Sequence, residues 1–220
     1  VHTWEEHENP FELVIQVLKK AGFKQGNIAI EEKTRFFISD GIKKAGKGFK
    51  LVSGDPITIP CRLIKSKNEI ALMQKANDIT AIAIQYGLTF LSEGINPATI
   101  SQKIAAKHAE LGGQHRFASV TFGVASSFPH GSSQKQILKK GDIVMLDCGC
   151  SVGGYESDIT RTIVFGPASE KQIKIWELEK RAQAAGFAAA KLGEPCENVD
   201  FAARKVIIDA GHGGKDPGNL

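Results

Sequence analysis

The sequence predicts an α+β protein in which helices cover one face of a largely antiparallel sheet, preceded by a smaller α/β segment. Helix-start signals alternate with short β-branched runs, and the strongest run, residues 143–165, contains two strands joined by a Gly-Gly turn. The pattern changes near residue 60, where two prolines mark a linker over residues 54–65. We therefore predict two domains, residues 1–60 and residues 61–220.

The first segment has a β-α-β rhythm that begins with a helix. Asn9, Pro10 and Glu12 supply an N-cap, a first-turn proline and a capping-box acid for a helix through Lys20. A strand, a helix and a strand are expected next, at residues 27–31, 34–45 and 49–53. Because so few elements cannot complete a sheet with its own core, we expect this segment to be the end of a longer α/β domain.

The second segment begins with a long helix. Ser66 and Glu69 fit a capping box at its start, and Glu93-Gly94 marks its end. Apolar residues recur along one side, which we expect to be buried: Ile70, Met73, Ile79, Ile82, Tyr86 and Phe90.

Further helices and strands follow in the α+β order. Asn96-Pro97 opens a helix to about Leu111, and residues 117–124 form a strand before a polar loop and the hairpin. Ser169 starts another helix, and residues 199–210 form the last one. For the helix after Ser169 we expect a buried side that carries Ile173, Trp176, Ala185 and Leu192.

Each strand of the hairpin carries one aspartate. If the two glycines form a two-residue turn, Asp147 lies opposite Thr160. Asp158 is two residues from Thr160, so Asp147 and Asp158 share one face of the sheet, which we expect to point inward.

Two carboxylates that converge in an apolar sheet repel each other, and a divalent metal ion would neutralise them. The alternative is ordinary turn chemistry, in which Asp158 pairs with Arg161 at a strand edge.

Composition excludes some classes of partner. The net charge is +4, from 28 basic and 24 acidic residues without a block of like charge, so nucleic acid is not expected as a partner. No apolar run approaches the roughly 18 residues of a membrane span, so no membrane is expected either. The cysteines lack zinc-site spacing, and we expect them to be reduced and mostly buried, as in a cytoplasmic protein: Cys61, Cys148, Cys150 and Cys196.

The segment PHGSSQKQILKKGDIVMLDCGCSVGGYESDITRTIVFG, which starts at residue 129, resembles the front half of the catalytic domain of the pita-bread metallopeptidases. These include methionine aminopeptidases, aminopeptidase P and prolidases. The family elements L-x-x-G-D, D-x-G, G-Y and S/G-D-x-[ST]-R-T all occur in order. The segment before residue 61, followed by RLIKSKNEI, resembles the end of the additional N-terminal domain of Xaa-Pro peptidases. The resemblance implies hydrolysis of Xaa-Pro bonds in peptides with proline at the second position, and it allows a homodimer.

The resemblance also implies a dinuclear metal site. Asp158 would bridge two divalent ions and Asp147 would bind one of them, with Mn²⁺ expected and Co²⁺ or Zn²⁺ as alternatives. Such ions hold a hydroxide that attacks the scissile carbonyl. His130 matches the histidine that contacts the substrate, and Thr160 would support the metal shell. The remaining family ligands, one His and two Glu, do not occur before Leu220, so we expect the chain to hold part of the site and to be inactive alone.

Other hypotheses stay open. A pita-bread protein can be an inactive binding module or a non-peptidase C–N hydrolase. Residues 206–218 also resemble the opening zinc motif of N-acetylmuramoyl-L-alanine amidases, in which His212 would be a ligand on a strand; we favour a helix that ends at Gly211. His108 and His115 are expected on the surface.

Overall fold

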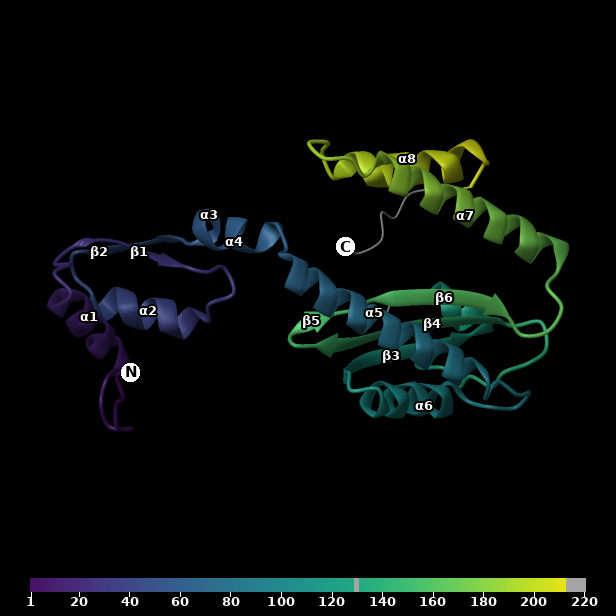
Figure 1. Ribbon diagram of the computed structural model, residues 1–220, viewed down its shortest axis with the longest axis horizontal. Coiled ribbons are helices and arrows are strands. Elements are labelled where there is room, and N and C mark those ends of the chain that lie inside the picture. The colour runs from purple at the N-terminus through teal and green to yellow at the C-terminus, as the bar shows by residue number, and fades with distance from the viewer. Residues whose placement is uncertain (129–130, 213–220) are drawn as a thin grey trace. The chain divides into compact units, whose positions relative to one another are not determined.

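The computed structural model describes residues 1–128 and 131–212, and the chain forms two compact units, Val1–Asn68 and Glu69–Leu220 (Figure 1).

The first unit has a two-stranded parallel sheet and four helices. Strand β1, Gly26–Ile30, pairs with β2, Phe49–Ser53. The helices are α1, Pro10–Lys20; α2, Phe36–Ala45; α3, Asp55–Thr58; and α4, Pro60–Leu63.

The start of α1 agrees with the expected cap, because the Asn9 side chain accepts a hydrogen bond from the Phe11 N–H at 3.0 Å. The predicted linker instead contains α3 and α4. Each has a proline in its first turn, where the missing N–H costs no helical hydrogen bond.

The second unit contains an antiparallel sheet. Its strands are β3, Gln114–Phe122; β4, Ile143–Val152; β5, Tyr155–Glu156; and β6, Ile159–Val164. β4 pairs with β3 on one side and with both β5 and β6 on the other. The predicted register is confirmed, since Asp147 pairs with Thr160.

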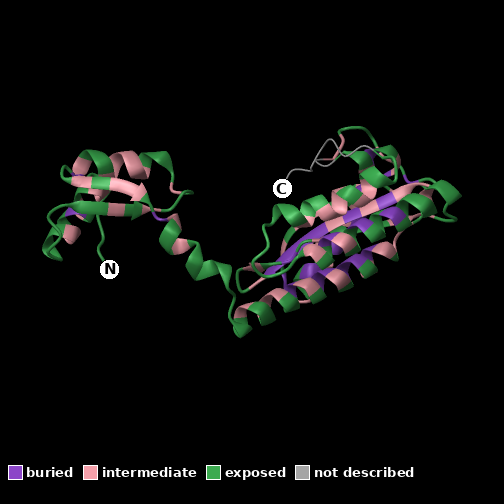
Figure 2. Ribbon diagram, turned by 90° about the horizontal axis from the view of Figure 1, so that it is seen from above, coloured by how far each residue is buried: buried purple, intermediate pink, exposed green. Residues whose placement is uncertain are grey.

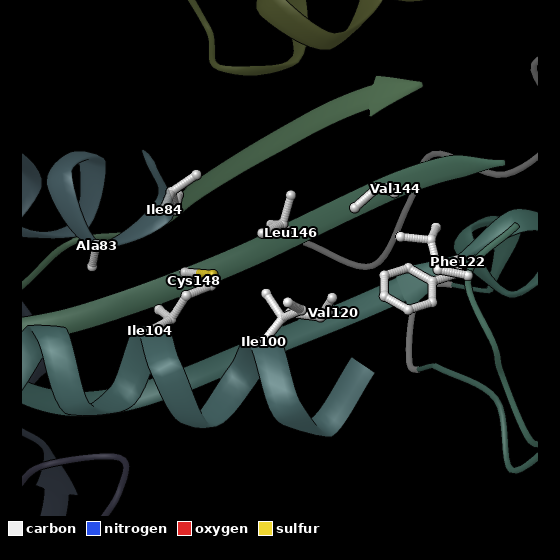
Figure 3. Close-up of a cluster of buried hydrophobic side chains, with 10 residues drawn as sticks. Ala83, Ile84, Ile100, Ile104, Val120, Phe122, Val144, Leu146 and Cys148 are labelled. Carbon is white, nitrogen blue, oxygen red and sulfur yellow. The ribbon is translucent and has the colours of Figure 1, made fainter. Parts of the chain in front are cut away.

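Two helices cover one face of this sheet. They are α5, Lys67–Leu88, and α6, Pro97–Glu110. Figure 2 shows the buried residues of this unit concentrated along the strands and the helices that face them. The core cluster lies between these helices and the sheet (Figure 3) and contains Ala83, Ile84, Ile100, Ile104, Val120, Phe122, Leu138, Val144, Leu146 and Cys148.

The predicted buried side of α5 is partly wrong. Ile70 and Ile82 are 56% and 48% exposed. The buried side combines the predicted Ile79 and one further isoleucine with four small residues: Ala76, Ile79, Thr80, Ala83, Ile84 and Gly87. Gly87 lets α5 approach α6 closely, since a methyl group added there would lie 2.7 Å from Ile104 Cγ1. Hydrophobicity alone misses a face that close packing selects.

The last two helices form a pair. They are α7, Glu170–Ala189, and α8, Glu197–Asp209, and the predicted start of α7 is confirmed by a capping box between Ser169 and Gln172. The predicted buried side of α7 is wrong, since Ile173 and Trp176 are about half exposed and Leu192 is fully exposed. α7 instead buries Leu178, Ala182 and Gly186, because it packs on α8.

This pair also corrects the predicted layering. Figure 1 shows α7 and α8 on the side of the sheet away from α6, so helices lie on both sides and not on one. Residues 206–209 lie within α8, and Gly211, with φ +81°, follows it. The strand that the amidase hypothesis requires is therefore absent from these residues.

Candidate metal site

The two aspartates of the hairpin lie close together on one face of the sheet. Asp147 projects from β4, and Asp158 lies in the two-residue gap between β5 and β6. Thr160, directly opposite Asp147, donates its hydroxyl hydrogen to Asp147 Oδ1 at 2.8 Å. The hairpin thus brings together the three predicted residues, with Thr160 fixing one carboxylate oxygen.

This face does not point inward as predicted. Asp147 is half-buried, and Asp158 and Thr160 are exposed. The core lies on the opposite face of β4, where Leu146 and Cys148 are fully buried. The sequence misleads here because the acidic face also carries apolar residues, Ile143 and Met145, which conceal the alternation between a covered and an open side.

A glycine determines how Asp158 is presented. In the continuous register of the hairpin, Gly149 lies opposite Asp158. A methyl group added at Gly149 would lie 2.4 Å from the Ser157 carbonyl oxygen and 2.5 Å from Phe117 Cε1. Only glycine lets the two chains pass this closely, which explains the glycine of the D-x-G segment.

The electrostatics of the pair fit a cation. Loss of water around the carboxyl group, the charge of Asp147 and a hydrogen bond with Asp147 together raise the pKa of Asp158. Burial and the charge of Asp147 also raise the pKa of the Cys148 thiol to about 12. Negative charge accumulates here, and a bound cation would relieve the repulsion.

The competing structural role for Asp158 is not supported. Arg161 belongs to the other face of β6, in register with Leu146, and its guanidinium donates to the Thr160 carbonyl oxygen at 2.8 Å. Within residues 1–128 and 131–212, no ion pair joins Arg161 to Asp158.

The site is limited to these groups in the described part of the chain. His130, the predicted substrate-contacting residue, lies outside the described residues. Among the described residues, no group of three or more His, Cys, Asp or Glu side chains could hold a metal ion.

The prediction for the two histidines is wrong. His108 is fully buried, and its Nδ1 lies 2.9 Å from Nδ1 of the half-buried His115. Burial and the neighbouring His115 lower the pKa of His108 to about 4. Burial also lowers the pKa of His115. Sequence reasoning missed the pair because a histidine on a polar helix resembles a surface residue; its signal is the i, i+7 spacing across the turn from α6 into β3.

The prediction that the cysteines are mostly buried holds only for the hairpin. Cys148 and Cys150 are buried, whereas Cys61 and Cys196 are exposed, and all four are free thiols. Cys61 lies in α4, and Cys196 immediately precedes α8.

An apolar groove of about 670 Å³ adjoins the acidic face. One side is formed by Ile143, Thr162 and Val164, which share the face of the aspartates. The other side comes from α7, including Ile173 and Trp176. The half-exposed side chains of α7 therefore line this groove.

No helix in the described residues is both long and apolar enough to cross a membrane.

The fold and the matched sequence place the chain among the metallopeptidases. Residues 71–219 match the profile of Metallopeptidase family M24, and the chain belongs to this family. The predicted α+β, pita-bread class is thereby confirmed.

Relatives support the same placement. YkvY of Bacillus subtilis is 34% identical over 218 residues, which cover 98% of this chain and 60% of YkvY. The Xaa-Pro dipeptidase of Pyrococcus horikoshii is 34% identical over 181 residues, covering 80% of this chain and 51% of that protein. A solved dipeptidase structure from Pyrococcus horikoshii OT3 superposes with a TM-score of 0.85 at 33% identity, covering 96% of this chain and 59% of that one. The chain thus spans about 60% or less of the length of these relatives.

Proposed function

We propose that the chain carries part of the active site of a metal-dependent peptidase that cleaves Xaa-Pro bonds, with Asp147 and Asp158 as ligands of two divalent ions. The observation that carries this proposal is the carboxylate pair on the open face of the hairpin, in a chain of family M24. The similarity to an Xaa-Pro dipeptidase supports the substrate class. We also propose that residues 1–60 are the end of an N-terminal α/β domain and residues 61–220 the first part of the catalytic domain.

The residues present fit such a metal centre. Hard carboxylate oxygens suit Mn²⁺, which we propose as the metal, ahead of Co²⁺ or Zn²⁺. The mutual repulsion of the pair, which raises the pKa of Asp158, is relieved when a cation is shared between them. When bound, the ions would polarise the scissile carbonyl and activate the attacking water.

The other residues would orient ligand and substrate. The hydrogen bond from Thr160 to Oδ1 orients the carboxylate of Asp147. His130 would contact the substrate near the scissile bond. Two carboxylates are too few ligands for tight metal binding, so we propose that the 220 residues alone bind Mn²⁺ weakly and do not turn over substrate.

The first test is metal binding. MnCl₂ is titrated into the ¹⁵N-labelled chain, and paramagnetic broadening of amide signals is followed by NMR, which detects weak sites. Signals of residues around Asp147 and Asp158 should broaden first, and Asp147→Asn or Asp158→Asn should abolish this selectivity. The matched control is Asp78→Asn, which removes an exposed acid on α5. Broadening that does not affect the hairpin signals first, or that remains selective in both variants, contradicts the proposed site.

The second test is activity. A dipeptide with proline at the second position is compared with the same dipeptide carrying alanine there, using the 220-residue chain and any longer product that its gene encodes. We expect Mn²⁺-dependent, proline-selective cleavage by an active product and loss of that activity in its Asp158→Asn variant. Metal-dependent cleavage without proline selectivity would contradict the substrate class, and Mn²⁺ binding without any cleavage by a longer product would favour an inactive binding module.

A further inference from the structure

A chain of buried polar side chains lies behind the aspartates, on the covered side of the sheet. Thr80 and His108 are fully buried and Ser157 is 3% exposed. Thr80 Oγ1 lies 2.7 Å from Ser157 Oγ and 3.3 Å from His108 Nε2. Unpaired, each such group would cost about 1–3 kcal/mol. These groups are paired with one another, across α5, α6 and the hairpin.

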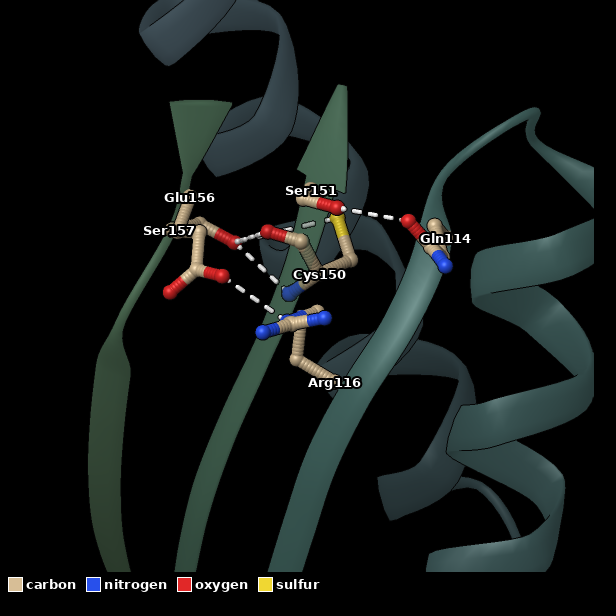
Figure 4. A network of polar contacts seen from close by, with 6 residues as sticks. All are labelled: Gln114, Arg116, Cys150, Ser151, Glu156 and Ser157. Carbon is tan, nitrogen blue, oxygen red and sulfur yellow. Dashed lines mark hydrogen bonds and ion pairs between the residues drawn. The ribbon is translucent and has the colours of Figure 1, made fainter. Parts of the chain in front are cut away.

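Ser157 connects this chain to the metal site, because it immediately precedes Asp158 in the gap between β5 and β6. Its Oγ accepts a hydrogen bond from the Cys150 N–H at 3.0 Å and lies 3.1 Å from the Cys150 carbonyl oxygen. Figure 4 shows the Ser157 side chain directed at Cys150. The Ser157 N–H donates to the Cys150 carbonyl oxygen at 2.9 Å, so the backbone makes one of the two ladder bonds of this pair, and the Ser157 side chain replaces its carbonyl oxygen in the other.

Asp158 thus sits on a segment that one backbone ladder bond holds at Ser157, so the ladder fixes its path only in part. The close approach at Gly149 sets one limit on that path. The bond between Ser157 and Thr80 sets the other, since it ties the segment to the middle of a long helix packed in the core.

We propose that Thr80 and Ser157 are positioning residues for the metal site, in which Thr80 holds the segment that carries Asp158 and His108 orients the Thr80 hydroxyl. The proposal rests on the proposed function, because it assigns Asp158 a metal-ligand role. None of these residues touches substrate or metal in this arrangement; they act through the backbone of Asp158.

The histidine pair sets the direction of the hydrogen bonds along this row of buried side chains. With both rings neutral, only one of the two facing Nδ1 atoms carries hydrogen. If His115 donates, His108 Nε2–H donates to Thr80, Thr80 to Ser157, and Ser157 to the Cys150 carbonyl, so every donor has an acceptor. In the reverse order Thr80 donates to His108, and the Cys150 carbonyl loses the hydroxyl contact. We expect the first order to prevail, because it makes one more hydrogen bond, from the Ser157 hydroxyl to the Cys150 carbonyl oxygen that also accepts from the Ser157 N–H.

The test separates a missing hydroxyl from a disturbed core. Thr80→Val removes the hydroxyl at nearly constant shape, Thr80→Ser keeps it, and Ser157→Ala removes the partner. The matched control is Thr121→Val: Thr121 is 3% exposed, and its hydroxyl has no hydrogen-bond partner among the described residues. For each variant of the full 220-residue chain, Mn²⁺-induced broadening around Asp147 and Asp158 is titrated, and amide exchange of Cys150 and residues 157–160 is measured.

We expect Thr80→Val and Ser157→Ala to weaken the Mn²⁺ response about tenfold, as for other residues that orient metal ligands, and to speed amide exchange at these positions. Thr80→Ser should restore both, and Thr121→Val should change neither. Thr80→Val with parental exchange and a parental Mn²⁺ response would overturn the proposal, as would an equal loss in Thr80→Ser. If the parent shows no selective Mn²⁺ response, the proposed function fails, while amide exchange still decides whether Thr80 holds the segment.

Discussion

The two faces of β4 differ sharply although they belong to one strand. On the covered face, Val144, Leu146 and Cys148 are fully buried against α5 and α6. On the open face, Met145 and Asp147 remain half-buried, and the acidic pair is reached by solvent. Because side chains alternate strictly along a strand, stability and chemistry can be assigned to separate sets of residues.

The separation has one exception. Ser157 reaches from the segment of Asp158 into the covered side, where it meets Thr80 and the buried His108. Within the described residues, this row of polar side chains is a direct hydrogen-bonded link between the segment of Asp158 and the core. Substitutions on the two faces can test the separation.

The largest effect is expected on the covered face. Leu146→Ala should lower the free energy of unfolding by about 4 kcal/mol, because Leu146 is fully buried and its removal leaves a cavity between the helices and the sheet. Urea denaturation of the chain, followed by circular dichroism, measures the change.

Met145→Ala is the control on the open face of the same strand. Its side chain is only half-buried, so a loss of about 1 kcal/mol or less is expected. Equal losses at the two positions would show that both faces carry the core and that the comparison is wrong.

The second effect is a dependence of stability on pH. The pKa of His108 is about 4 in the folded chain, against about 6.5 when unfolded. The unfolded state therefore takes up the proton first as the pH falls. The contribution of His108 to the free energy of unfolding is fully present above pH 6.5. It should decrease by up to about 3 kcal/mol as the pH falls to 4.

His108→Gln isolates this contribution, since glutamine keeps hydrogen-bonding atoms without titrating in this range. Facing His108 are the imidazole of His115 on β3, the hydroxyl of Thr80 on α5 and, beyond Thr80, the Cys150 thiol on β4. Unfolding of both proteins between pH 4 and 7 should show a smaller loss in the variant. Parallel curves would contradict a neutral, buried His108.

Much of both units follows from local sequence signals. The caps at Asn9, Asn96 and Ser169 and the hairpin register agree with the structure, because each depends on residues within a few positions of one another. The proximity of Asp147 and Asp158 follows from that register alone. The family is recognisable for the same reason, since its motif lies in one continuous segment.

What the sequence did not predict depends on contacts between distant elements. The buried side of α5 is decided by how closely Gly87 lets α6 approach, and the buried side of α7 by its packing on α8. The polar chain joins residues 77 positions apart, Thr80 and Ser157, which no periodicity reveals. Which face of β4 is covered also depends on where the helices fold back, since both faces carry apolar residues.

The smallest expected effect is on the open face. The pKa of Asp158 is raised, so the ionised pair opposes folding once the pH exceeds that pKa. Asp158→Asn removes this repulsion and should raise the free energy of unfolding at pH 7 by less than about 1 kcal/mol, because the carboxyl group is exposed and screened. Below the carboxyl pKa the free energies of unfolding of the two proteins should converge, and Asp78→Asn should show no comparable gain.

Millimolar MnCl₂ should reverse the order of stability, because it stabilises the parent and leaves the Asp158→Asn variant unchanged. A variant less stable than the parent without metal would show that Asp158 supports the fold. The open face would then contribute to stability as the covered face does, and the comparison between the two faces would be wrong.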